Sequence, residues 1–211
     1  NKVVPISYQD AWKTIRSIGS HFVTNLRPDD TIGILTPNRL NGAFIDLACL
    51  SYHIRVVPIP INLSADHLDY VLDHADITHL FTGSENVRDL LNNAKIDTNA
   101  LNMVCLDNEN EWESFLKICY QSTLTIPNKK EMYDLATIMY TSGTTDNPKG
   151  IIFNQTNIIT KRFARALALP EIGSNDSFLC YLPLYHTFGR WLEMMGTIFW
   201  GSTYTFTENT S

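Results

Sequence analysis

Residues 140–153, with the sequence YTSGTTDNPKGIIF, combine side chains that suit a polyphosphate ligand. Serine, threonine and glycine residues and one lysine stand between two apolar runs. Small residues leave backbone N–H groups open, hydroxyls donate hydrogen bonds, and a lysine supplies a mobile positive charge. A polar hairpin turn has a similar composition, so composition alone leaves a phosphate-binding loop and a simple turn as equal alternatives.

Two well-known nucleotide-binding loops do not fit this stretch. The P-loop needs Gly-Lys followed by Ser or Thr at the start of a helix. Here Lys149 follows Pro148 and precedes Gly150, and the next residues, IIF, are typical of a strand. The Rossmann turn is excluded because the chain contains no G-x-G-x-x-G. A phosphate loop at this position therefore belongs to a different design.

A second motif lies downstream of this loop. The segment YLPLYHTFGR (181–190) is an apolar run that ends in Leu-Pro-Leu, one further residue and His186. Together with IMYTSGTTDNPKG (138–150), it resembles the core motifs of the adenylate-forming enzymes: acyl-coenzyme A synthetases, aryl-acid ligases, peptide-synthetase adenylation domains and luciferases. Upstream, residues 33–50 and 56–83 resemble the N-terminal half of the same core domain. The similarity spans nearly all of the 211 residues.

This resemblance implies a reaction and a set of ligand contacts. A substrate carboxylate attacks the α-phosphate of ATP and gives an acyl-adenylate and pyrophosphate, with Mg2+ bridging phosphate oxygens. Coenzyme A then takes the acyl group. Catalysis of this kind relies on positioning and charge stabilisation. The resemblance assigns no metal ligand in this chain, and the residues that it places around the β- and γ-phosphates are Thr141, Ser142, Gly143, Thr144, Thr145 and Lys149.

Asp146 departs from the family pattern, which favours glycine or serine at its position. An inward-facing carboxylate would repel a polyphosphate, since two unit charges about 4 Å apart interact by roughly 4 kcal/mol at an effective dielectric constant of about 20. Aspartate is also a good turn former and tolerates the left-handed conformation. We therefore expect Asp146 to point outward as a turn residue, with ATP binding retained.

His186 is the second candidate site residue. A lone histidine after an apolar strand is more often structural than functional. Its place in LPLYH, however, matches the family's histidine or aromatic residue beside the acyl pocket, so the resemblance implies a catalytic-site role. Phe188, Gly189 and Arg190 either line the same wall or pack as an ordinary helix. The segment FGRWLEMMG (188–196) is more similar to fatty-acyl members than to amino-acid-activating ones, which favours a long apolar acid.

Alternating strand and helix patterns position these motifs. A cap at Ser7 and helical spacing as far as Leu26 predict the first helix. Further helices are predicted over 42–53, 64–75, 85–94 and 111–120, and strands over 31–35, 54–59, 78–82 and 102–106. This alternation indicates parallel pairing through crossovers. The predicted fold is therefore a layered α/β domain, with a mostly parallel sheet and helices on both faces.

The polar stretch 121–134 interrupts the alternation, which predicts a sub-boundary near 119–134. Beyond it we predict strands over 135–140, 150–154, 178–182 and 203–206, and helices over 155–169 and near 190–200. The family's later motifs, hinge and mobile C-terminal domain are not found in residues 1–211. We therefore expect an incomplete N-terminal core, the first portion of the AMP-binding large domain, which is inactive alone.

Composition limits the partners of the chain. With 44% hydrophobic and 18% charged residues it is typical of a soluble globular protein. The net charge of -6 argues against nucleic-acid binding. No apolar run approaches the roughly 20 residues of a membrane-spanning helix, although peripheral membrane contact stays open. The scattered cysteines predict buried thiols of a reducing compartment, hence a cytoplasmic location.

The sequence leaves several alternatives to the ligase function. A zinc site at His67 and His74 is disfavoured, because their spacing is two helical turns and zinc motifs on helices space ligands one turn apart. A solvated helix face explains these histidines better. A non-catalytic relative that binds a ligand or regulates is the main alternative function, and an unrelated phosphate-binding hydrolase is a third. Lys149 and the intact Ser/Thr run favour the acid-thiol ligase.

Overall fold

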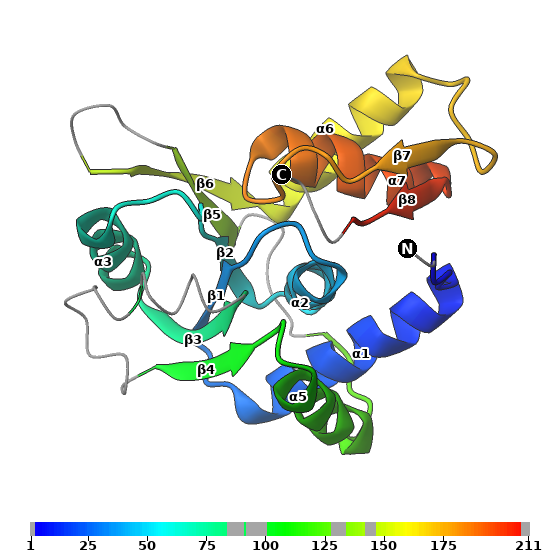
Figure 1. The fold of residues 1–211 in the computed structure, drawn as a ribbon. Helices are drawn as coiled ribbons and strands as arrows, with labels where there is room; N and C mark the ends of the chain where they lie inside the picture. The colour runs from blue at the N-terminus through cyan, green and yellow to red at the C-terminus, as the bar shows by residue number, and fades with distance from the viewer. Residues whose placement is uncertain (1–2, 84–90, 92–100, 128–133, 142–146, 208–211) are drawn as a thin grey trace.

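A central sheet of six strands organises the chain. The computed structural model describes residues 3–83, 91, 101–127, 134–141 and 147–207. The strand order is β4-β3-β1-β2-β5-β6 (Figure 1). Neighbours from β4 to β5 pair in parallel, whereas β5 and β6 are antiparallel, so the predicted mostly parallel sheet is confirmed. The strands are β1 (Thr31–Leu35), β2 (Arg55–Pro58), β3 (Ile77–Thr82), β4 (Asn102–Cys105), β5 (Leu135–Thr141) and β6 (Lys149–Asn154).

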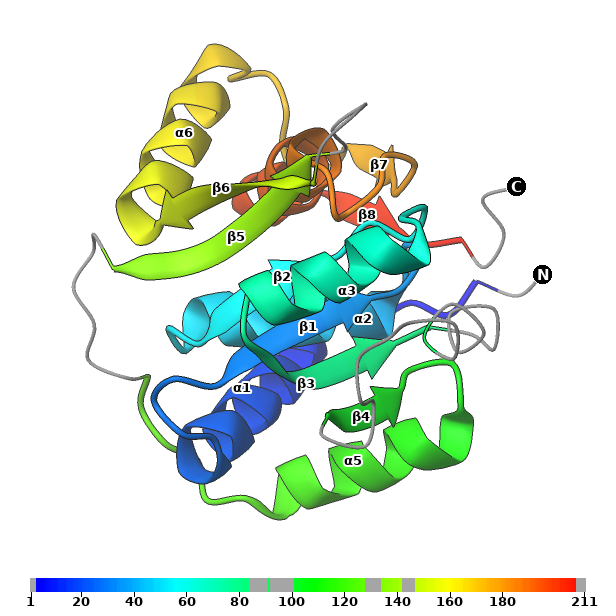
Figure 2. The same cartoon turned by 90° about the vertical axis from the view of Figure 1, so that its left-hand side faces the viewer.

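Helices cover both faces of the sheet, as predicted (Figure 2). On one face lie α1 (Tyr8–Asn25), α2 (Leu40–Ser51) and α5 (Glu109–Gln121), and on the other lies α3 (Ala65–His74). Each face of the sheet has its own hydrophobic core, and adjacent residues of a strand contribute to opposite cores because side chains alternate across a strand. Val56 packs into the core under α1 and α2, and Val57 packs into the core under α3. The helix predicted over 85–94 lies, apart from residue 91, outside the described residues.

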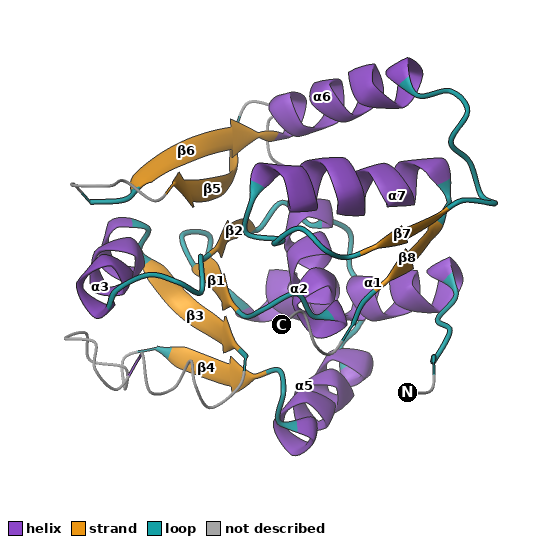
Figure 3. Ribbon diagram, turned by 45° about the horizontal axis from the view of Figure 1, so that its top comes forward, coloured by secondary structure: helices purple, strands orange, loops and turns teal. Residues whose placement is uncertain are grey.

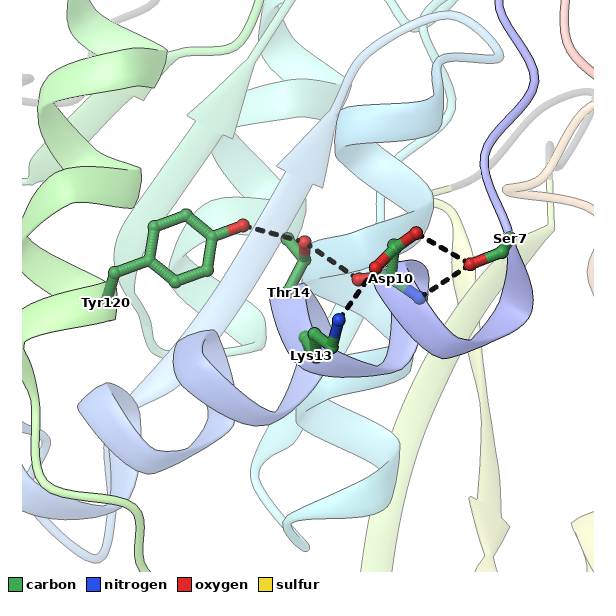
Figure 4. A network of polar contacts seen from close by, with 5 residues as sticks. All are labelled: Ser7, Asp10, Lys13, Thr14 and Tyr120. Atoms are coloured by element: carbon green, nitrogen blue, oxygen red, sulfur yellow. Dashed lines mark hydrogen bonds and ion pairs between the residues drawn. The ribbon is translucent and has the colours of Figure 1, made fainter.

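The start of α1 shows how local sequence and tertiary contact combine (Figure 4). The Asp10 backbone N–H donates to Ser7 Oγ at 3.1 Å, and the Ser7 hydroxyl donates to Asp10 Oδ2 at 2.7 Å, which confirms the predicted cap. Lys13 adds an exposed ion pair with Asp10 at 2.9 Å. The hydroxyls of Thr14 and Tyr120 lie 2.8 Å apart and join α1 to α5.

The β5–β6 pair is a hairpin and not a crossover unit. A parallel connection takes about a dozen residues or more, which the short link between Thr141 and Lys149 cannot supply. The antiparallel register places Thr141 opposite Lys149 at the end that carries the connecting loop, and Leu135 opposite Asn154 at the other end. The predicted strands are therefore present, with an orientation that the alternation of helices and strands did not indicate.

The last part of the chain forms a small unit beside the hairpin (Figure 3). Its elements are α6 (Gln155–Ala168), β7 (Ser177–Leu179), the π-helix η2 (Phe188–Met194), α7 (Met195–Trp200) and β8 (Thr203–Thr205). Strands β7 and β8 pair in parallel as a separate sheet. The helix predicted near 190–200 is thus a π-helix continued by α7, which ends at Gly201 in a left-handed conformation with φ 69°.

Candidate active site

Thr141 and Lys149 face each other where β5 ends and β6 begins. The Thr141 hydroxyl donates to the Lys149 carbonyl oxygen at 3.4 Å. Both residues are exposed, and within the described ranges Lys149 has no ion-pair partner. No described carboxylate therefore competes with an anionic ligand for its ammonium group. The predicted contacts of Ser142, Gly143, Thr144 and Thr145, and the direction of Asp146, lie outside the described residues and stay predictions.

Tyr140, the residue before Thr141, is anchored by α3. Its side chain is 4% exposed, and its hydroxyl lies 2.7 Å from Nδ1 of His74. The Tyr70 ring stacks on His74 with ring centroids 5.0 Å apart. Burial, with smaller contributions from Tyr70 and Asp76, raises the pKa of Tyr140 to about 12, so the phenol stays protonated. The hydrogen bond between Tyr140 and His74 therefore fixes the end of β5 to α3, and the sequence alone did not predict it.

His74, one of the two histidines of the disfavoured zinc site, contacts Tyr140 and Tyr70 in this aromatic cluster. Across the described ranges, no group of three or more histidine, cysteine, aspartate or glutamate residues is arranged to hold a metal ion.

The loop of the second motif is held on one side by Asn38. The Asn38 amide donates to the carbonyl oxygens of Leu182 at 2.9 Å and Cys180 at 3.4 Å. In return, the Leu184 backbone N–H donates to Asn38 Oδ1 at 2.9 Å. Asn38 is 8% exposed and follows β1, so a residue near the start of the chain orders the backbone of the LPLYH segment.

Glu193 of η2 holds the same loop from the other side. Its Oε2 accepts from the Leu182 backbone N–H at 3.3 Å and from the Tyr204 hydroxyl at 3.4 Å. Burial raises the pKa of Glu193, and the hydrogen bonds from Leu182, Tyr204 and Tyr181 act in the opposite direction. Desolvation is the largest of these effects, so the folded protein holds the Glu193 proton more tightly than a solvated glutamate does.

The raised pKa predicts a pH dependence of stability. A carboxyl with a folded pKa above its unfolded value adds stability below the unfolded pKa and loses that contribution as pH rises through the folded pKa. We expect Glu193→Gln to reduce this decrease in the free energy of unfolding with rising pH. The measurement is urea denaturation at a series of pH values from about 4 to about 7. Glu113→Gln, at an exposed position of α5, is the control and should keep the wild-type slope. An unchanged slope in Glu193→Gln would contradict the assignment.

His186 lies in the turn that leads into η2. Its backbone N–H donates to the Pro183 carbonyl oxygen at 2.9 Å, and its own carbonyl oxygen accepts from the Arg190 backbone N–H at 3.0 Å. The imidazole is exposed. The structure therefore brings Thr141 and Lys149 together and places His186 on a separate, well-braced loop. No hydrogen bond between His186 and either residue is found in the part of the chain that is described.

The residues after His186 differ in their exposure to solvent. Phe188 is 56% exposed, whereas Arg190 is fully buried. Of the two alternatives for Arg190, the structure shows packing: its guanidinium pairs with Asp46 of α2 and also bonds Thr137 of β5. The sequence signal for Asp46 is a single acid within the apolar helical stretch GAFIDLACL, which belongs to neither of the two motifs.

Known proteins resemble this chain along its whole described length. The family model described as AMP-binding enzyme matches residues 2–211. Fatty acyl-CoA synthetase A of Dictyostelium discoideum is 31% identical over 206 residues, which cover 88% of this chain and 30% of that protein. Long chain acyl-CoA synthetase 3 of Arabidopsis thaliana is 27% identical over 214 residues, which cover 91% and 32%. The chain thus spans about a third of the length of these curated relatives.

Solved structures show the same fold. ATP-bound MatB from Rhodopseudomonas palustris superposes with a TM-score of 0.81 at 20% identity, over 98% of this chain and 41% of that one. The O-succinylbenzoate coenzyme A synthetase MenE from Bacillus subtilis, in complex with AMP, superposes with a TM-score of 0.74 at 20% identity, over 100% and 52%. The layered α/β arrangement predicted above is therefore confirmed.

Proposed function

The chain belongs to the AMP-binding enzyme family, and on that premise we propose that it is part of an ATP-dependent acid-thiol ligase acting on a fatty acid. The carboxylate attacks the α-phosphate of ATP, the bond to pyrophosphate breaks, and an acyl-adenylate forms. The thiol of coenzyme A then takes the acyl group and releases AMP. Relatives named as fatty acyl and long chain acyl-CoA synthetases support this substrate class.

The observation that carries the proposal is the loop end of the β5–β6 hairpin. There Thr141 and Lys149, which has no ion-pair partner among the described residues, flank the loop whose composition suits a polyphosphate. Lys149 is proposed to contact the β- and γ-phosphates as a cation, and Thr141 as a hydroxyl donor. The proposed role of His186 is to border the acyl group and the adenylate.

Mg2+, when bound to the phosphate oxygens, supplies charge neutralisation. We propose no protein ligand for it in residues 1–211.

We also propose that residues 1–211 are the N-terminal portion of a larger AMP-binding domain, since they match about a third of each curated relative. The sub-boundary proposed near 119–134 overlaps the last residues of α5 and ends just before β5. A cytoplasmic location and the absence of nucleic-acid partners belong to the same proposal. None of the helices within the described residues has the length and apolar character that crossing a membrane would need.

The main test is ATP-pyrophosphate exchange by the full-length protein that contains this chain. We expect exchange that depends on Mg2+ and is fastest with long-chain fatty acids among a panel of fatty, aryl and amino acids. Added coenzyme A should then convert the adenylate to a thioester with release of AMP. Asp146 is the feature that favours a non-catalytic relative, and that alternative replaces the ligase if no acid supports exchange.

Asp146→Gly is expected to change the KM for ATP and the exchange rate by less than about threefold, which is below 1 kcal/mol. The reason is that we place the carboxylate outward, where solvent screens it from the phosphates. Asp146→Asn removes the charge and keeps the turn-forming side chain, so it separates charge from conformation. A gain of orders of magnitude in either variant would show that the carboxylate faces the nucleotide.

A further inference from the structure

Arg190 is the largest of the fully buried side chains in the described part of the chain. Its Nε donates to Asp46 Oδ2 at 2.8 Å, and its Nη2 donates to Asp46 Oδ1 at 2.5 Å. Its Nη1 donates to Thr137 Oγ1 at 2.8 Å. Asp46 is 5% exposed and Thr137 is 0% exposed, so the whole group lies in the interior.

A buried ion pair of this kind is poor evidence for stability. Removing both charges from water costs about as much as their attraction returns, and apolar side chains of similar volume often serve stability equally well. What the pair adds is direction, because a planar guanidinium fixes two carboxylate bonds and a further acceptor in one plane. The contacts of Arg190 therefore define a geometry between the elements that carry them.

The partners of Arg190 lead to both candidate loops. Thr137 lies on β5, the strand that continues to Thr141, and its hydroxyl also donates to the Val56 carbonyl oxygen of β2 at 2.5 Å. On the other side, the Arg190 backbone N–H donates to the His186 carbonyl oxygen at 3.0 Å. One residue thus connects the strand that enters the phosphate loop with the turn that presents His186.

The backbone around Arg190 makes this connection stiff. Arg190 lies in a π-helix, a rare conformation that is frequent at functional sites. The neighbouring Gly189 packs on the motif loop so closely that a Cβ there would lie 2.3 Å from the Pro183 carbonyl oxygen and 2.5 Å from that of Leu182. A shift of η2 would therefore be transmitted to the LPLYH segment, which Asn38 and Glu193 brace from either side.

We propose that Arg190 is a positioning residue, which sets the His186 turn against the phosphate-loop strand through Asp46 and Thr137. The inference rests on the ligase function proposed above and adds to it a group that touches neither ATP nor the acid.

The deciding experiment uses Arg190→Met/Asp46→Leu in the full-length protein. Because apolar residues replace the whole ion pair, the melting temperature is expected to stay within about 4 °C of the wild type. The kcat of ATP-pyrophosphate exchange is expected to fall about 10- to 100-fold, since misplacement of reacting groups by about 1 Å has an effect of that order. The KM for ATP should change by less than about threefold, because Lys149 and Thr141 are untouched. If the Arg190–Asp46 pair has only a structural role, this stable double variant should keep the wild-type kcat.

Thr137→Val is the second variant and decides the question if the double variant fails to fold. It keeps the shape of the side chain and leaves the Asp46 pair in place, and it removes both the bond from Arg190 to β5 and the bond to the Val56 carbonyl oxygen of β2. We expect a loss of kcat in the same direction and of smaller size. Thr82→Val, at a buried position of β3 in the same sheet, is the matched control and should keep the wild-type kcat.

The outcomes separate this inference from the proposed function. Wild-type exchange with unchanged kcat in both the double variant and Thr137→Val would overturn the positioning role and leave the ligase standing. Absence of exchange in the wild type would overturn the ligase, and the inference with it.

Discussion

Replacing Lys149 with methionine is expected to lower ATP-pyrophosphate exchange by the full-length protein about 100- to 1000-fold, the range found when one oriented donor to a developing charge is lost. Methionine keeps an aliphatic stem of similar length, so the pairing of β6 with β5 is preserved. What is lost is the ammonium group at the loop end of the hairpin, for which no carboxylate competes within the described structure.

The measurement is the initial exchange rate at saturating fatty acid and varied ATP. Lys117→Met, at an exposed position of α5, carries the same chemical change away from the hairpin and should retain wild-type exchange. Both variants should unfold at the wild-type temperature, because each removed side chain is exposed. An effect of less than about threefold at Lys149 would show that this lysine does not contact the phosphates of ATP.

Arg190→Met alone is expected to lower the free energy of unfolding by about 3–5 kcal/mol. The substitution leaves the Asp46 carboxylate 5% exposed, without its cation and with two hydrogen bonds lost. A buried charge that has lost its partner is far more costly than an apolar pair in the same place. The double variant, in which no charge remains, is by contrast expected to be about as stable as the wild type.

Urea denaturation at neutral pH measures this effect. Arg27→Met, at an exposed position after α1, is the matched control and should change the free energy of unfolding by less than about 0.5 kcal/mol. Adding Asp46→Leu to Arg190→Met should recover most of the loss. If the single variant is as stable as the control, the Arg190–Asp46 contact does not exist in solution.

Local patterns were sufficient to predict the elements that carry the motifs. The apolar run 135–140 between polar residues corresponds to β5, Leu135–Thr141, and the run 150–154 corresponds to β6, Lys149–Asn154. The cap at Ser7 was recognised because its partner, Asp10, is a neighbour in sequence. Such features depend on the period and turn chemistry of a few adjacent residues, and these are visible in any single sequence.

Contacts between distant residues were not predictable in this way. Arg190 and Asp46 are 144 positions apart, and each stands in a stretch that otherwise reads as an ordinary helix. The π-helix had no signal either, because the spacing of apolar residues in 190–200 fits a regular helix. Tyr140 was seen as part of a motif, but its bond to His74 depends on how α3 lies across the sheet.

The hydrogen bonds between Asn38 and the LPLYH segment also lead to an expectation about the order of folding. The hairpin closes over a short loop and can form early, whereas the bond between Leu184 and Asn38 spans 146 positions. Contacts of such sequence separation carry the largest loop-closure entropy and form slowly. We therefore expect the turn bearing His186 to take its final place only after β1 has assembled, and later than the hairpin that carries Thr141 and Lys149.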